Sequence, residues 1–110
     1  MMELKKLAEK LGLDEEDIIE LFELYVETTA SDLAELKGAH EAKDSPLVHA
    51  KAHSIKGASG NLGLDEIYHL AKEIDDRARV NSLDGLKEMI QILEEKYNSF
   101  VKEFEICNQQ

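Results

Sequence analysis

A histidine and a lysine stand three residues apart near the middle of the chain, among an unusual number of glycines. Residues 52–63 read AHSIKGASGNLG and contain three of the six glycines in the 110-residue sequence. A neutral imidazole such as that of His53 offers a ring nitrogen as a nucleophile. The ammonium group of Lys56, about one helical turn away, can offset negative charge on a group bound there. These residue types favour the transfer of a small anion, and a phosphoryl group is the simplest candidate.

The spacing places the histidine on the outer face of a predicted helix. At about 100° per residue, a stripe that should face the core is formed by Val48, Ala52, Ile55, Ser59 and Leu62. A second arc, which should face water, is formed by His49, His53, Lys56, Gly57 and Gly60. A glycine inside a helix costs about 1 kcal/mol relative to alanine. We therefore expect Gly57 and Gly60 to remove bulk beside His53 so that a partner can approach it.

The charge around this segment also differs from that of the rest of the chain. Residues 43–60 hold three lysines, Lys43, Lys51 and Lys56, and one aspartate, whereas the whole chain has a formal charge of −11. A small anion should therefore prefer this segment to any other. The overall acidity argues against binding to nucleic acid and to anionic membrane surfaces.

Composition predicts a cytoplasmic protein with one domain over residues 1–110. The chain has no apolar run near the roughly 18 residues of a membrane-spanning helix and no signal-peptide pattern at its start. A single cysteine, Cys107, fits a reducing compartment. Met1 and the short tail at 107–110, expected to be frayed, favour a free-standing protein over a segment of a larger hybrid kinase.

Hydrophobic periodicity predicts an all-α fold. A short N-terminal helix carries Leu4, Leu7, Ala8 and Leu11, and longer helices are expected at about 14–38, 45–61, 65–80 and 83–105. Breakers make 38–46 the expected connection, with a helix that persists through 41–43 as the alternative. Four long amphipathic helices with short connections indicate an antiparallel up-down four-helix bundle, with the short helix packed over one end. Each helix shows one apolar stripe, so a monomer is expected.

The segment around His53 resembles the signature of histidine-containing phosphotransfer (HPt) domains. The resemblance rests on AHSIKG at 52–57 and on Gly63, ten residues after the histidine, and the helical layout matches nearly the whole chain. HPt domains are four-helix bundles that pass a phosphoryl group between aspartates of response-regulator receiver domains. The resemblance implies that His53 accepts the phosphoryl group, that Lys56 balances its charge and that Gly57 gives access.

Gly60 and Gly63 match small or glycine positions of the pattern. His49 is a further candidate binding residue, because it lies on the same outward arc as His53. The partners would be receiver domains or a hybrid sensor histidine kinase, and Mg²⁺ would be bound by the receiver, not by this chain. The sequence has no glycine-rich nucleotide loop, so no kinase activity of its own is expected. The direction of phosphoryl flow stays open.

Two other functions are compatible with parts of the same sequence. A helical docking module would use the same glycine-thinned surface without chemistry. A metal site would use His49 and His53, four residues apart, or the Glu66-x-x-His69 pattern, which resembles half of a di-iron motif. Neither has the further ligands that such a site needs, so no metal is predicted. His40 and His69 are expected to be exposed bystanders.

Overall fold

The computed structural model describes residues 3–108, and all regular structure in that range is helical. The five helices are α1 (Leu4–Leu11), α2 (Glu15–Glu41), α3 (Ser45–Asn61), α4 (Asp65–Arg79) and α5 (Leu86–Asn108). The predicted all-α class is therefore confirmed. Within these residues, no helix combines the length and the apolar character needed to cross a membrane.

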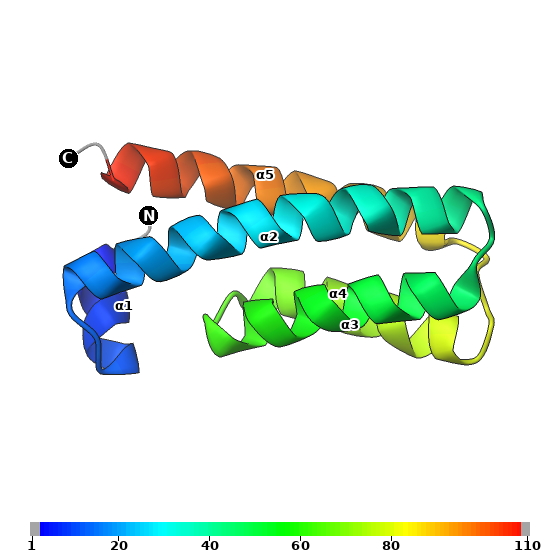
Figure 1. Cartoon of the computed structure of the whole chain (residues 1–110), viewed down its shortest axis with the longest axis horizontal. Coiled ribbons are helices and arrows are strands. Elements are labelled where there is room, and N and C mark those ends of the chain that lie inside the picture. The colour runs from blue at the N-terminus through cyan, green and yellow to red at the C-terminus, as the bar shows by residue number, and fades with distance from the viewer. Residues whose placement is uncertain (1–2, 109–110) are drawn as a thin grey trace.

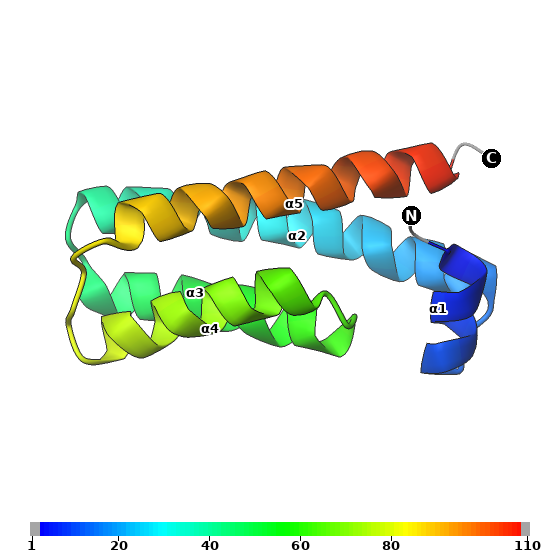
Figure 2. The same ribbon diagram turned by 180° about the vertical axis from the view of Figure 1, so that it is seen from behind.

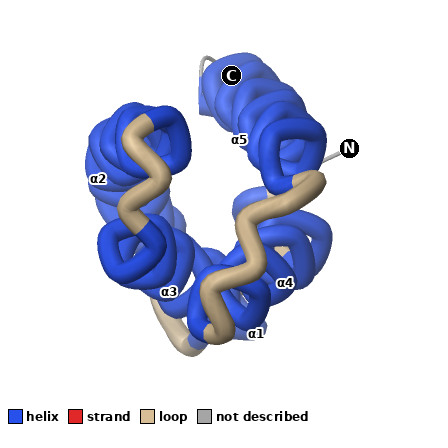
Figure 3. Tube along the Cα trace, turned by 90° about the vertical axis from the view of Figure 1, so that its right-hand side faces the viewer, coloured by secondary structure: helices blue, strands red, loops and turns tan. Residues whose placement is uncertain are grey.

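Four of the helices lie lengthwise beside one another. Consecutive members of α2–α5 run in opposite directions, as Figures 1 and 2 show from two sides. Viewed end-on in Figure 3, α3 lies between α2 and α4, and α5 lies beside α4 and α2, in agreement with the contacts between these helices. The short helix α1 packs against α2 at one end of the molecule, which measures 42 × 22 × 19 Å.

The core is formed by the apolar stripes of these helices. All five residues of the stripe predicted for α3 are buried, which confirms the helical register that places His53 on another face. At the end near α1, Phe22 of α2 contacts Phe100 and Phe104 of α5 edge-to-face, with ring centroids 5.4 and 5.6 Å apart. Tyr25 and Ser59 share a buried hydrogen bond of 2.8 Å between their hydroxyl groups, which joins α2 to α3.

Local sequence signals set both ends of α3. The Asp44 carboxylate accepts a hydrogen bond from the backbone N–H of Leu47 at 3.2 Å, and Pro46 occupies the first turn. At the other end, Gly63 has a φ of +72°, and the N–H of Leu64 reaches back to the carbonyl of Ser59 at 2.9 Å. This closure turns the chain within three residues, so α4 returns antiparallel along α3.

Two helix boundaries differ from the main expectation. The first long helix, α2, continues past Gly38 to Glu41, which is the alternative left open from the sequence, and Lys43, with a φ of +56°, adopts the left-handed conformation in the connection. The last helix begins at Leu86 instead of about 83, after Gly85 with a φ of +79°. A helix can continue through a glycine such as Gly38 because tertiary packing can offset the cost of the glycine. Helix propensity alone therefore does not fix the end of α2.

The expected fraying near the C-terminus was also wrong for the residues that can be described. Cys107 and Asn108 belong to α5, and Cys107 is partly buried against the core. Residues 109–110, like Met1, lie outside the described part of the chain. The last helix, α5, therefore extends beyond Phe104 and past its expected end at about 105.

Candidate functional site

His53 projects from α3 toward solvent at the edge of α4. Its side chain is 61% exposed, and its Nδ1 lies 3.4 Å from Oδ2 of Asp75 on α4. The two residues meet because α3 and α4 run antiparallel from the tight turn at Gly63. Residues that lie a similar number of positions before and after this turn are therefore neighbours. The expectation of an exposed imidazole is thus met, but one ring nitrogen faces a neighbouring helix.

Asp75 is the centre of the site. Its side chain is completely buried, yet four basic side chains surround it. Oδ2 lies 3.2 Å from Nζ of Lys56 and 3.6 Å from Nη2 of Arg79, and Nδ1 of His49 contacts Oδ1. A buried charge is tolerated when it is paired and hydrogen-bonded in this way.

Two opposing effects act on the pKa of Asp75. Burial by itself raises the pKa of this carboxyl group, but hydrogen bonds from Lys56, His49 and His53 lower it more, so that the net shift is downward from 3.8. The group is therefore ionised at neutral pH. An ionised carboxylate can only accept hydrogen bonds, which decides the state of the imidazole beside it.

The ionised carboxylate selects one tautomer of His53. The hydrogen of the neutral ring stays on Nδ1, which faces Asp75, and the lone pair is then on Nε2, at the other side of the ring. Carboxylates behind metal-bound histidines fix the ring in the same manner and raise its basicity. In this arrangement Nε2 of His53 carries the free lone pair, and Lys56 and Arg79 share Oδ2 of Asp75 with the ring.

The three glycines near His53 differ in their surroundings. A Cβ added at Gly57 would meet nothing within 4 Å, so this position leaves open surface one turn from His53. A Cβ at Gly60 would lie 3.0 Å from Cδ1 of Tyr68 on α4, so the missing side chain accommodates that ring. Gly63 has open space but a positive φ, and its role in the fold is to end α3.

Two expectations about the surroundings of His53 hold only in part. Of the arc that should face water, His53, Gly57 and Gly60 are exposed, but His49 and Lys56 are partly buried, and Lys56 is only 21% exposed because it reaches Asp75. The lysines of 43–60 do not gather into one positive surface: Nζ of Lys51 pairs with Oε2 of Glu35 at 2.6 Å, and Lys43 lies in the connection after α2. Of these three, only Lys56 takes part in the cluster, and the second cation, Arg79, comes from α4.

The two residues of α4 in the cluster, Asp75 and Arg79, were missed from the sequence. One signal was present, because Asp75 continues the four-residue spacing of Ile67 and Ala71 along the buried face of α4. A carboxylate on such a stripe must have partners in the interior. Which partners these are depends on how α3 and α4 are aligned, which no pattern within one helix specifies.

The residues of the two metal hypotheses have other contacts in this structure. Nδ1 of both His49 and His53 faces Asp75, Oε2 of Glu66 lies 3.2 Å from Nζ of Lys96, and the ring of His69 contacts that of Tyr68. Over residues 3–108, no three histidine, cysteine, aspartate or glutamate side chains are grouped so that they could hold a metal ion.

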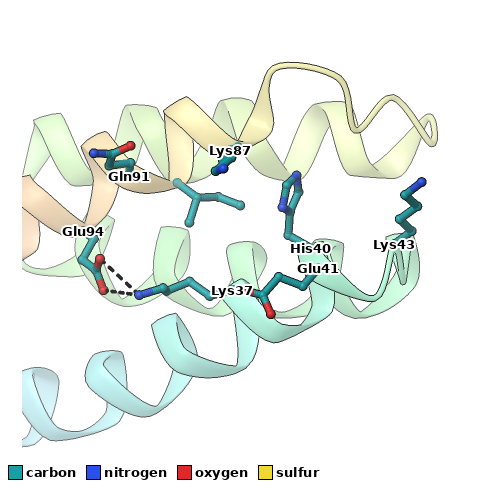
Figure 4. Close-up of a pocket in the computed structure, with 8 residues that line it drawn as sticks. Lys37, His40, Glu41, Lys43, Lys87, Gln91 and Glu94 are labelled. Atoms are coloured by element: carbon teal, nitrogen blue, oxygen red, sulfur yellow. Dashed lines mark hydrogen bonds and ion pairs between the residues drawn. The ribbon is translucent and has the colours of Figure 1, made fainter.

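Of the surface hollows outside the cluster, two lie next to residues named above. One is a pocket between α2 and α5, in which Lys37 pairs with Glu94 at 3.1 Å and His40 and Lys87 line the opposite end (Figure 4). None of its lining residues comes from α3 or α4, so it does not belong to the His53 site. His40, expected to be an exposed bystander, is partly buried there.

The second hollow is an apolar groove between α1, α2 and the C-terminal end of α3. It is lined by Leu11, Leu13, Leu21, Leu24, Tyr25, Thr28, Ala58, Asn61 and Leu62. More than a third of the surface is exposed in each of four leucines, Leu11, Leu13, Leu21 and Leu24. Ala58 and Asn61 lie five and eight residues after His53, or about 7.5 and 12 Å along the helix.

A helical scaffold that carries a histidine with a selected tautomer and nearby cations has the features of a histidine phosphotransfer protein. Comparisons with known proteins agree. The family model of the Hpt domain matches residues 20–101. The structure is similar to that of histidine-containing phosphotransfer protein B (HptB) from Pseudomonas aeruginosa PAO1, with a TM-score of 0.86 and 26% sequence identity over 96% of this chain and 90% of that chain. A search of curated proteins finds no match.

The chain belongs to the Hpt domain family. It is a histidine phosphotransfer protein of phosphorelay signalling, a class of phosphoryl carriers that interact with receiver domains and kinases. The resemblance stated from the sequence is thereby confirmed at the level of family and function.

Proposed function

We propose that His53 accepts a phosphoryl group from the aspartyl phosphate of a receiver domain and passes it to the aspartate of another. The observation that carries this assignment is the exposed His53 ring, whose Nδ1 faces the buried Asp75 carboxylate. Nε2 attacks the phosphorus atom, the N–P bond forms, and the bond between phosphorus and the receiver's carboxylate oxygen breaks. The electron pair of that bond stays on the receiver's carboxylate.

The cluster stabilises the product of this step. Nδ1 keeps its hydrogen throughout, so the ring becomes positively charged when Nε2 is phosphorylated, and Asp75 faces that charge. Lys56 and Arg79, both held at Oδ2 of Asp75, offset the charge of the phosphoryl oxygens. The same contacts serve the reverse direction, because a positively charged ring is the better leaving group.

We further propose that the receiver covers the apolar groove next to α3. A stable interface buries about 800 Å² per partner, which corresponds to a radius of about 16 Å around His53. The groove residues on α3 lie within that radius, and exposed leucines supply apolar area for such an interface. Gly57 and Gly60, exposed on α3, lie in the same area, so the receiver is expected to pass over them.

The rest of the proposal concerns the whole chain. Residues 1–110 act as one domain, an antiparallel up-down four-helix bundle with a short N-terminal helix, and work as a cytoplasmic monomer. One continuous core cluster supports this view, because residues of all five helices contribute to it. The chain does not phosphorylate itself from ATP, so incubation with Mg²⁺ and ATP alone should leave its mass unchanged.

The test is transfer from a phosphorylated receiver domain, followed by intact-mass measurement. The wild type should gain one phosphoryl group that is labile in acid and stable in base, and His53→Gln should gain none. His69→Gln is a matched control, because His69 is an exposed histidine on α4. Phosphate on His53→Gln would refute the assignment. A stable complex without any transfer would identify the protein as a docking module.

A further inference from the structure

His49 occupies a place in the cluster that the proposed transfer does not use. It lies one helical turn before His53 on α3, and the two ring centroids are 5.9 Å apart. Nδ1 of His49 contacts Oδ1 of Asp75, whereas Nδ1 of His53 approaches Oδ2. The same buried carboxylate is therefore held at one oxygen by a histidine outside the reaction and at the other by the histidine that reacts.

Oδ2 of Asp75 is shared between competing groups. Lys56 at 3.2 Å and Arg79 at 3.6 Å are charged, whereas His53 at 3.4 Å offers a neutral N–H group. Charged donors form the stronger hydrogen bonds. The torsion that turns a carboxylate has a broad energy minimum, so Asp75 could rotate to give both oxygens to the two cations. The contact of His49 with Oδ1 opposes this rotation.

We propose that His49 is a positioning residue for phosphoryl transfer, which holds Oδ1 of Asp75 so that Oδ2 stays directed at Nδ1 of His53. This inference rests on the proposed function and adds to it a residue that acts only through Asp75. Without the contact, part of the His53 population carries its hydrogen on Nε2. In that tautomer Nε2 has no lone pair with which to form the N–P bond.

The test compares two substitutions of His49. His49→Ala removes the donor, whereas His49→Gln replaces it with an amide N–H group that can contact the same oxygen. We expect His49→Ala to slow phosphorylation of His53 about tenfold, the lower end of the range for losing a partner behind a metal-bound histidine. The slowing should be the same with a phosphorylated receiver and with phosphoramidate, a small phosphoryl donor, and His49→Gln should restore most of the rate.

A spectroscopic measurement reports the cause directly. In ¹⁵N NMR spectra of the imidazole groups, the wild type and His49→Gln should show the hydrogen of His53 on Nδ1, and His49→Ala should show a mixture of tautomers. His40→Ala is the matched control, because His40 lies in the pocket between α2 and α5. A melting curve of each variant verifies its fold, and His49→Leu replaces His49→Ala if the latter is unfolded.

Two results would overturn the inference. One is an unchanged rate together with a single Nδ1–H tautomer in His49→Ala. The other is slowing with the receiver alone, which would make His49 a docking contact. If the wild type accepts no phosphoryl group from either donor, the proposed function fails, and the tautomer of His53 in the variants still decides the role of His49.

Discussion

Gly57 provides the sharpest test of the argument that the surface beside His53 is kept clear. The position lies within α3, and an added Cβ would meet nothing within 4 Å. Replacing a glycine inside a helix by alanine stabilises the helix by about 1 kcal/mol. For a domain of this size we expect Gly57→Ala to raise the melting temperature by about 4 °C. Gly57→Leu should give a similar increase, because leucine is nearly as good a helix former.

The effect of these variants on phosphoryl transfer should be opposite in sign. Positions 53 and 57 are four residues apart, so their side chains are neighbours on the helix surface. A leucine side chain there would keep a receiver from reaching His53 closely, and a displacement of about 1 Å can cost about a hundredfold in rate. We expect Gly57→Leu to slow transfer from a receiver at least about tenfold, while phosphorylation by phosphoramidate stays within about twofold.

Stopped reactions analysed by intact mass measure both rates, and calorimetry measures the melting temperature. Gly60→Ala is the matched comparison, because it has the same gain in helix propensity but places a Cβ 3.0 Å from Tyr68. It should therefore be less stable than Gly57→Ala. Undiminished transfer from the receiver to Gly57→Leu would refute the idea that this glycine provides access. Equal slowing with phosphoramidate would show that the substitution disturbs His53 itself.

Leu24 is 58% exposed in the groove, and Leu24→Glu should weaken receiver binding in a titration by about tenfold with an unchanged melting temperature. The control Ile92→Glu on α5 should bind normally, and equal effects of the two variants would exclude the groove as the docking surface. Tyr25→Phe should lower the free energy of unfolding by about 1–3 kcal/mol because it leaves the buried hydroxyl of Ser59 unpaired, and adding Ser59→Ala should recover part of this loss in urea titrations. Folding lowers the pKa of Asp75 from its ordinary value of 3.8, so the ionised carboxylate stabilises the folded state at pH values above 3.8. This contribution is lost as the pH falls through the folded-state pKa. The difference in unfolding free energy between the wild type and Asp75→Asn should therefore shrink below about pH 4, and a constant difference would contradict the shift.

Much of this protein follows from patterns within single helices. The spacing of apolar residues placed Val48, Ala52 and Ile55 in the core and His53 on another face, and the structure agrees. The end of the helix predicted at 45–61 also agrees, because it is followed by Gly63, whose φ of +72° few other residues adopt. The motif around His53 led to the correct family because it lies in one short segment of sequence.

Contacts between helices are of another kind. The buried Asp75 was missed, the packing of Tyr68 against Gly60 was not foreseen, and the lysines of 43–60 were treated as one positive region. Each of these properties depends on the alignment of α3 with α4 or α2. The position of a residue along one helix determines which face of that helix its side chain lies on. The charged and bulky groups that the side chain contacts there belong to another helix. Only when the chain is folded do His53, Lys56 and Arg79 meet at one carboxylate.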